Sequence, residues 1–148
     1  MEYKESLNLL EKRTEELYSD VDTLSLHLFP IETLESMKNF YVVKLAYMAE
    51  VKSDAFAAFN EAKTALKIIL NEKKVHHLQD LSGSDKARIA TMYAEKDCKT
   101  EMQGVAILEN EYKEISNRYS VTETIVRSLT QTISTVKSEM ERQQFIKG

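Results

Sequence analysis

The sequence predicts an all-α protein whose long helices pair in an antiparallel hairpin or bundle. Its 148 residues include three Gly and one Pro, too few for the tight turns of a β-sandwich or a Rossmann sheet. Hydrophobic residues make up 43% of the chain, and they recur at alternating steps of three and four residues. That spacing is typical of helices that pack like coiled coils. We expect one helical domain over residues 1–148.

The first predicted helix covers residues 1–29. Pro30 ends it, because proline lacks an N–H and clashes with the preceding turn, and Pro30 can also begin the next helix. Residues 19–22 (SDVD) are a weaker candidate break, since Ser and Asp compete for backbone groups. The apolar positions of this segment are Tyr3, Leu7, Leu10, Thr14, Leu17, Val21, Leu24 and Leu28.

The second predicted segment covers residues 30–80. At 1.5 Å per residue, a continuous helix of this size would be a rod of roughly 75 Å. A rod of that length needs antiparallel partners from the same chain or from other subunits. Its apolar positions are Leu34, Tyr41, Leu45, Met48, Ala55, Phe59, Ala62, Leu66 and Ile69.

The clearest turn signal is LSGSD at residues 81–85, where Gly83 suits a helix C-cap and Ser84 the next N-cap. The third predicted segment covers residues 85–147, and its repeat becomes regular from Leu108 onward. Gly104 is a weak point inside it. The sequence leaves open whether the long helices are continuous or hinged near Asp22 and Gly104.

The long seams favour a homo-oligomer, because another copy of the chain would bury them, although the subunit number is not specified. Aromatic residues at seam positions are expected in a core or subunit interface rather than at a ligand. The residues predicted for the oligomer seam are Leu45, Met48, Phe59, Tyr112, Ile115, Tyr119, Val126, Leu129, Ile133 and Val136.

The sequence carries no motif for catalysis, so we expect no enzyme, cofactor or metal. Glycine stands only at 83, 104 and 148, which excludes a P-loop and a dinucleotide fingerprint. The adjacent His76 and His77 point about 100° apart on a helix and do not readily clamp one metal. Cys98 is the only cysteine, so no intramolecular disulfide can form. A reduced, cytoplasmic compartment and no membrane partner are expected.

The most informative charge feature is a basic stretch around the turn. The net charge of the chain is −4, yet bases outnumber acids here. A row of lysines can neutralise the phosphates of a single strand, or it can be an ordinary solvated face. Aromatic residues that could stack on bases are missing near these lysines, since Phe56 and Phe59 lie one or two turns earlier and Phe59 is on the apolar seam. The candidate DNA-binding residues are Lys63, Lys67, Lys73, Lys74, Lys86 and Arg88.

Short strings in a particular order add a family resemblance over residues 30–148. They are FYVVKL at 40–45, KTALK at 63–67, KTEM at 99–102, VKS at 136–138 and RQQFIKG at 142–148. In this order and spacing the chain resembles the UvsY family of phage recombination mediator proteins. Only Lys67 can be carried over from the family's basic string, because Ile68 and Ile69 stand where the family has a further basic residue.

The resemblance implies an oligomeric, ring-forming protein without catalytic activity. Such a protein binds single-stranded DNA and helps a recombinase replace the single-strand-binding protein, in the host cytoplasm if the chain is phage-encoded. The alternative is a helical oligomeric adaptor or chaperone-like module that binds a partner protein through an amphipathic face, without nucleic acid. Salt-sensitive binding to oligonucleotides discriminates between the two.

Overall fold

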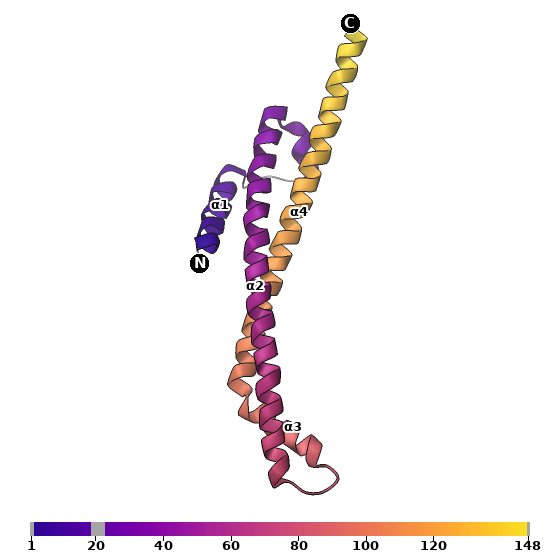
Figure 1. Cartoon of the computed structure of the whole chain (residues 1–148). Helices are drawn as coiled ribbons and strands as arrows, with labels where there is room; N and C mark the ends of the chain where they lie inside the picture. Colours follow the sequence, from indigo (N-terminus) through magenta and orange to yellow (C-terminus); the bar gives the residue numbers. More distant parts are fainter. Residues whose placement is uncertain (1, 19–22, 148) are drawn as a thin grey trace. The chain divides into compact units, whose positions relative to one another are not determined.

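A computed structural model describes residues 2–18 and 23–147, and both stretches are helical without any strand (Figure 1). The all-α prediction is therefore confirmed. The elements are α1 (Glu2–Tyr18), the 3₁₀ helix η1 (Thr23–Leu28), α2 (Ile31–Asp80), α3 (Lys86–Asp97) and α4 (Lys99–Lys147). The candidate break at residues 19–22 lies outside the described residues.

The first predicted helix differs from the structure in its second half. Thr23–Leu28 form a 3₁₀ helix rather than the end of one α-helix that continues to residue 29. The tighter winding places residues three apart on one side. It brings both Leu26 and Phe29 to the same apolar cluster, and the Phe29 N–H donates to the Leu26 carbonyl at 3.1 Å. Leu28, predicted for the seam, is instead 74% exposed.

The third predicted segment is interrupted at Cys98, and Gly104 lies inside α4. Cys98 has φ −102° and ψ 19°, outside the helical range. Its N–H still donates to the Ala94 carbonyl at 3.0 Å, and its own carbonyl accepts from Met102 N–H at 2.9 Å. The interruption therefore costs little backbone hydrogen bonding, which explains how it occurs without a Gly or Pro.

The turn between α2 and α3 lies where the sequence predicted it. Gly83 has φ +103°, a backbone conformation that residues with a side chain rarely adopt. The N-cap of α3 is Asp85 rather than the predicted Ser84, and the Asp85 side chain makes no capping hydrogen bond. The turn is thus determined by the glycine and not by a side-chain cap.

The chain divides into two compact units. Unit 1 comprises Met1–Lys52 and Ile115–Gly148, and unit 2 comprises Ser53–Glu114. The core of unit 1 joins η1, α2 and α4, with Phe29, Ile125, Val126 and Val136 packed around it. Its buried residues are Leu26, Leu34, Met37, Tyr41, Leu129 and Ile133.

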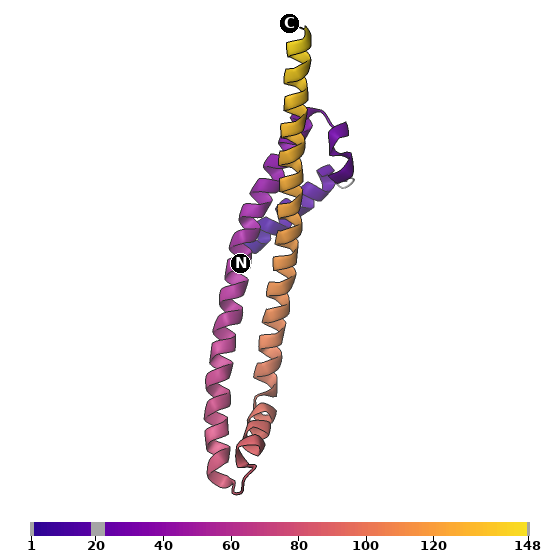
Figure 2. The ribbon, with the colours of Figure 1, turned by 90° about the vertical axis from the view of Figure 1, so that its right-hand side faces the viewer.

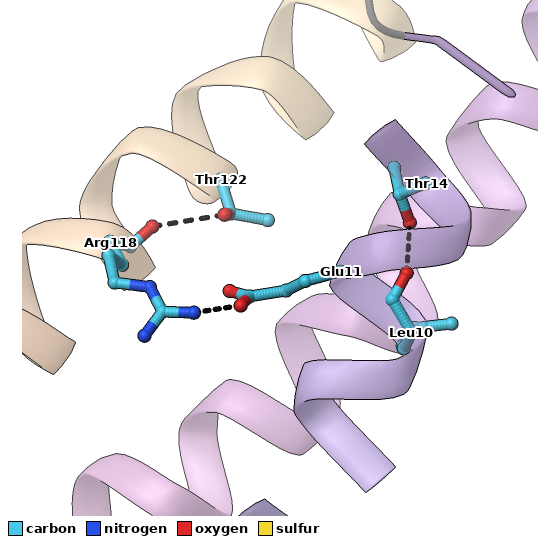
Figure 3. A network of polar contacts seen from close by, with 5 residues as sticks. All are labelled: Leu10, Glu11, Thr14, Arg118 and Thr122. Atoms are coloured by element: carbon cyan, nitrogen blue, oxygen red, sulfur yellow. Dashed lines mark hydrogen bonds and ion pairs between the residues drawn. The ribbon is translucent and has the colours of Figure 1, made fainter. Parts of the chain in front are cut away.

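Helix α1 is tied to α4 within unit 1 by an ion pair (Figure 3). The Arg118 guanidinium donates to the Glu11 carboxylate. Next to it, the buried hydroxyls of Thr14 and Thr122 donate to the carbonyls of Leu10 and Arg118, at 2.7 and 3.0 Å. Each buried threonine is therefore satisfied by its own helix, as a hydroxyl removed from water requires.

The last turns of α4 extend beyond the start of α2 in both views of unit 1 (Figures 1 and 2). Every side chain from residue 137 to residue 147 is exposed. Phe145 and Ile146 are 89% and 82% exposed. This end of α4 therefore leaves apolar surface uncovered by the described part of the chain.

Candidate nucleic-acid interface

Unit 2 is a helical hairpin in which α3 packs closely on the second half of α2 (Figure 2). The packed face of α3 consists of small side chains. Ala90 and Ala94 are 0% and 2% exposed, and Cys98 is 1% exposed. Because small residues permit close approach of two helices, side chains on both edges of this contact are brought together.

Within this hairpin, positive charge concentrates in the segment around the turn. Residues 63–99 contain eight Lys and Arg against five Asp and Glu, an excess of +3. The remainder of the chain contains twelve against nineteen, which is −7, so the two parts account for the net −4. An anionic ligand that approaches the chain is therefore attracted to residues 63–99 and repelled by the rest of the chain.

One edge of the contact between α2 and α3 is an open groove of about 520 Å³. Lys67 and Lys74, seven residues apart on α2, both line it. Lys63, whose spacing would place it on the same side of the helix, is not among the lining residues. Glu95 of α3 is the acidic residue in the lining. The other lining residues are Ile68, Leu70, Asn71, Thr91 and Ala94. The groove thus offers two ammonium groups and an amide against one carboxylate, while the Thr91 hydroxyl donates to the Ala87 carbonyl at 3.0 Å.

The other predicted basic residues are distributed around the hairpin rather than gathered in the groove. Lys63 lies over the ring of Phe59, with its Nζ 5.8 Å from the ring centroid. Lys73 is close enough to Asp97 for its charge to act on that carboxylate. Lys86 and Arg88 are exposed on α3, and Arg88 Nη1 donates to the sulfur of Met92 at 3.7 Å.

The opposite edge of the same contact carries His77 and Asp97. The Nε2 atom of His77 lies 2.6 Å from Oδ2 of Asp97, which joins α2 to α3. This hydrogen bond lowers the pKa of Asp97 below its ordinary value of 3.8; partial burial opposes the shift, and the charges of Lys73 and Lys96 add to it. The carboxylate is therefore held in its charged form.

Tyr93 lies beside this pair and was missed by sequence reasoning. Its ring centroid is 5.4 Å from that of His77, and the side chain is 46% exposed. An exposed aromatic residue thus does lie among the lysines, contrary to the expectation from Phe56 and Phe59. No signal marked it, because His77 and Tyr93 are sixteen residues apart and meet only once the turn is formed.

Cys98 lies next to this edge and is buried. Burial raises the pKa of its thiol above the ordinary 9.0, and the charge of Glu101 adds to the effect. A thiol with a raised pKa is mostly protonated at neutral pH and is a poor nucleophile.

The predicted seam residues are all at least partly covered by the chain itself. Met48, Ile115, Leu129 and Ile133 are buried. The half-buried ones are Leu45, Phe59, Tyr112, Tyr119, Val126 and Val136. In unit 2, Tyr112 lies against Phe56 and Phe59, at centroid distances of 5.3 and 6.3 Å. The seam therefore serves first to pack the helices of one chain.

Within the described residues, no group of three His, Cys, Asp or Glu is placed to hold a metal ion. The helices, so far as they are described, include none long and apolar enough to cross a membrane. Comparisons with protein-family models, curated proteins and solved structures find no match to this chain.

Proposed function

We propose that this chain is a non-catalytic protein that binds single-stranded DNA through the helical hairpin of unit 2. The observation that carries the proposal is the groove in which Lys67 and Lys74 stand together. Two lysines along one groove suit a polyanion, because each can neutralise a phosphate and release its counterions. The amide of Asn71 adds a donor that can bond phosphate or sugar oxygens.

The biological role that we propose is that of a recombination mediator, which helps to load a recombinase on DNA that a single-strand-binding protein covers. This part of the proposal rests on the resemblance to the UvsY family, whose basic string is matched at Lys67. The concentration of positive charge in residues 63–99 supports it, since the rest of the acidic chain would repel DNA. We also propose that several copies of the chain associate with one another.

The proposal is tested by fluorescence anisotropy of a labelled oligo(dT), titrated at several salt concentrations between about 50 and 200 mM. We expect binding that weakens steeply with salt. The double variant K67Q/K74Q should bind more weakly. It should also lower the slope of log K against log salt by about 0.7 for each phosphate that a lysine no longer neutralises.

The matched control is K12Q/K113Q, which removes two exposed lysines from α1 and α4 and changes the net charge equally. It should leave the salt slope close to that of the wild type. If both double variants weaken binding alike, only net charge matters and the groove is not the site. If the folded wild type does not bind at low salt, the DNA proposal is wrong, and the adaptor hypothesis takes its place.

A further inference from the structure

We infer that Tyr93, braced by His77, is a stacking platform for an unpaired nucleobase, so that the hairpin recognises bases as well as phosphates. This inference rests on the proposed function and adds the ligand's chemical class: a strand whose bases are exposed. Its starting point is that Tyr93 keeps 46% of its surface exposed although it sits at the contact between two helices. A tyrosine that only filled a gap in packing would be largely covered.

The position of Tyr93 on α3 explains this exposure. Successive residues of a helix are separated by about 100°, so Tyr93 stands about 80° to one side of the midpoint between the buried Ala90 and Ala94. Thr91, which lines the lysine groove, stands about 80° to the other side. The platform and the groove therefore occupy opposite edges of one helix contact.

The ring of His77 lies against one side of the Tyr93 ring. Its ring is tilted 43° to that of Tyr93 at a centroid distance of 5.4 Å, and Asp97 holds its Nε2 atom at 2.6 Å. The imidazole of His77 therefore contacts two residues of α3: its Nε2 atom contacts Asp97, and its ring contacts Tyr93. This arrangement limits the motion of the Tyr93 ring from one side and leaves its other surface to solvent.

Lysines flank the two rings. Lys73 precedes His77 by one helical turn on α2, and Lys96 follows Tyr93 by three residues on α3, so each shares a side with its aromatic neighbour. The charges of both lysines reach Asp97, which places them near the ring pair. Aromatic rings between cations are the elements from which sequence-independent binding of single strands is built, with bases stacked and phosphates neutralised.

The test compares two strands of about 12 nucleotides, a length within the usual site sizes: oligo(dT) and an abasic deoxyribose-phosphate strand with the same number of phosphates. The wild type should bind oligo(dT) about tenfold more tightly than the abasic strand. Y93A should reduce this preference to less than about twofold, while Y93F, which keeps the ring, should retain it. These changes follow from the loss of one stacked base.

Two controls separate stacking from other effects. K67Q/K74Q should weaken binding to both strands by the same factor and keep the preference, because it removes phosphate contacts only. Y47A, a matched loss of a half-buried tyrosine in unit 1, should also keep it. Circular dichroism confirms that each variant is folded.

The outcomes distinguish this inference from the proposed function. If the wild type binds neither strand, the proposed function fails, and the platform fails with it. If the wild type binds both strands equally, or Y93A keeps the preference for oligo(dT), the platform is wrong while DNA binding stands. The comparison within the wild type needs no variant, so a Y93A protein that does not fold leaves the inference testable.

Discussion

At the scale of single residues, Asp97 ties the stability of unit 2 to pH. The hydrogen bond from His77 lowers its pKa in the folded state below 3.8. A carboxyl whose pKa is lowered by folding stabilises the folded state when it is ionised. Its contribution is complete above its ordinary pKa of 3.8 and is lost as the pH falls through the lower folded value.

We therefore expect D97N to lower the Tm, measured by circular dichroism, at pH values well above 3.8. The difference from the wild type should shrink as the pH falls from 3.8 through the lower pKa of the folded state, because Asp97 is protonated first in the unfolded state and only then in the folded state. D54N, which removes an exposed carboxylate from α2 in the same unit, should show no such dependence. A D97N effect that persists unchanged at low pH would mean that the carboxylate charge is not the cause.

The residues of the candidate interface also show which of its contacts could be predicted from the sequence. Lys67 and Lys74 could be predicted to share a side, because seven residues are close to two full turns of one helix. Tyr93 and His77 belong to different helices, and their contact depends on where α3 packs against α2. That packing depends on Ala90, Ala94 and Cys98, small residues that are not conspicuous in the sequence.

At the scale of elements, we expect replacement by alanine to change the stability of the protein in opposite directions at two glycines. Gly104 lies inside α4, and no atom would lie within 4 Å of an added Cβ. Alanine there should stabilise the protein by up to about 1 kcal/mol, because glycine loses more backbone freedom in a helix. Gly83 has equally open surroundings but φ +103°, so alanine should destabilise by about 1–2 kcal/mol.

Urea unfolding followed by circular dichroism measures both changes, and each variant is the control for the other. The same methyl group is added in both, and neither meets a neighbouring atom. A loss of stability in G104A would show that this glycine is needed for something other than helix formation. A neutral G83A would mean that the turn can adopt another conformation.

The ends of a helix could be predicted from the sequence where a single local signal, such as a proline or a glycine turn, determines them. The second predicted segment, 30–80, agrees with α2 at Ile31–Asp80, since Pro30 and the turn around Gly83 leave little choice for its ends. The 3₁₀ winding of Thr23–Leu28 and the interruption at Cys98 were not predictable in the same way. Both depend on which side chains become buried, Leu26 in one case and Cys98 in the other.

At the scale of the whole molecule, the regular spacing of apolar residues has two possible uses that sequence alone cannot separate. The same seam can pack the helices of one chain or join several chains. Met48, Ile115, Leu129 and Ile133 are buried by their own chain. The most exposed apolar side chains include residues that the repeat did not select, such as Phe145 and Ile146.

We expect the chain to self-associate through the C-terminal end of α4. Phe145 and Ile146 are 89% and 82% exposed, and contact with a second copy would remove this apolar surface from water. Light scattering coupled to gel filtration at micromolar concentration should give a multiple of the 17.1 kDa chain mass. The variant F145D/I146D should lower that mass, because burying two carboxylates in an apolar interface is costly.

The matched control is Q143D/Q144D, which adds the same charge within the same turns of α4. It should keep the oligomer, since polar side chains at 143 and 144 are already solvated. A wild type of 17.1 kDa would show that self-association is wrong. An oligomer that both double variants leave intact would instead place the subunit contacts away from this end. If F145D/I146D yields single chains that still bind oligo(dT), though more weakly, then each hairpin binds by itself and assembly adds avidity by linking several hairpins.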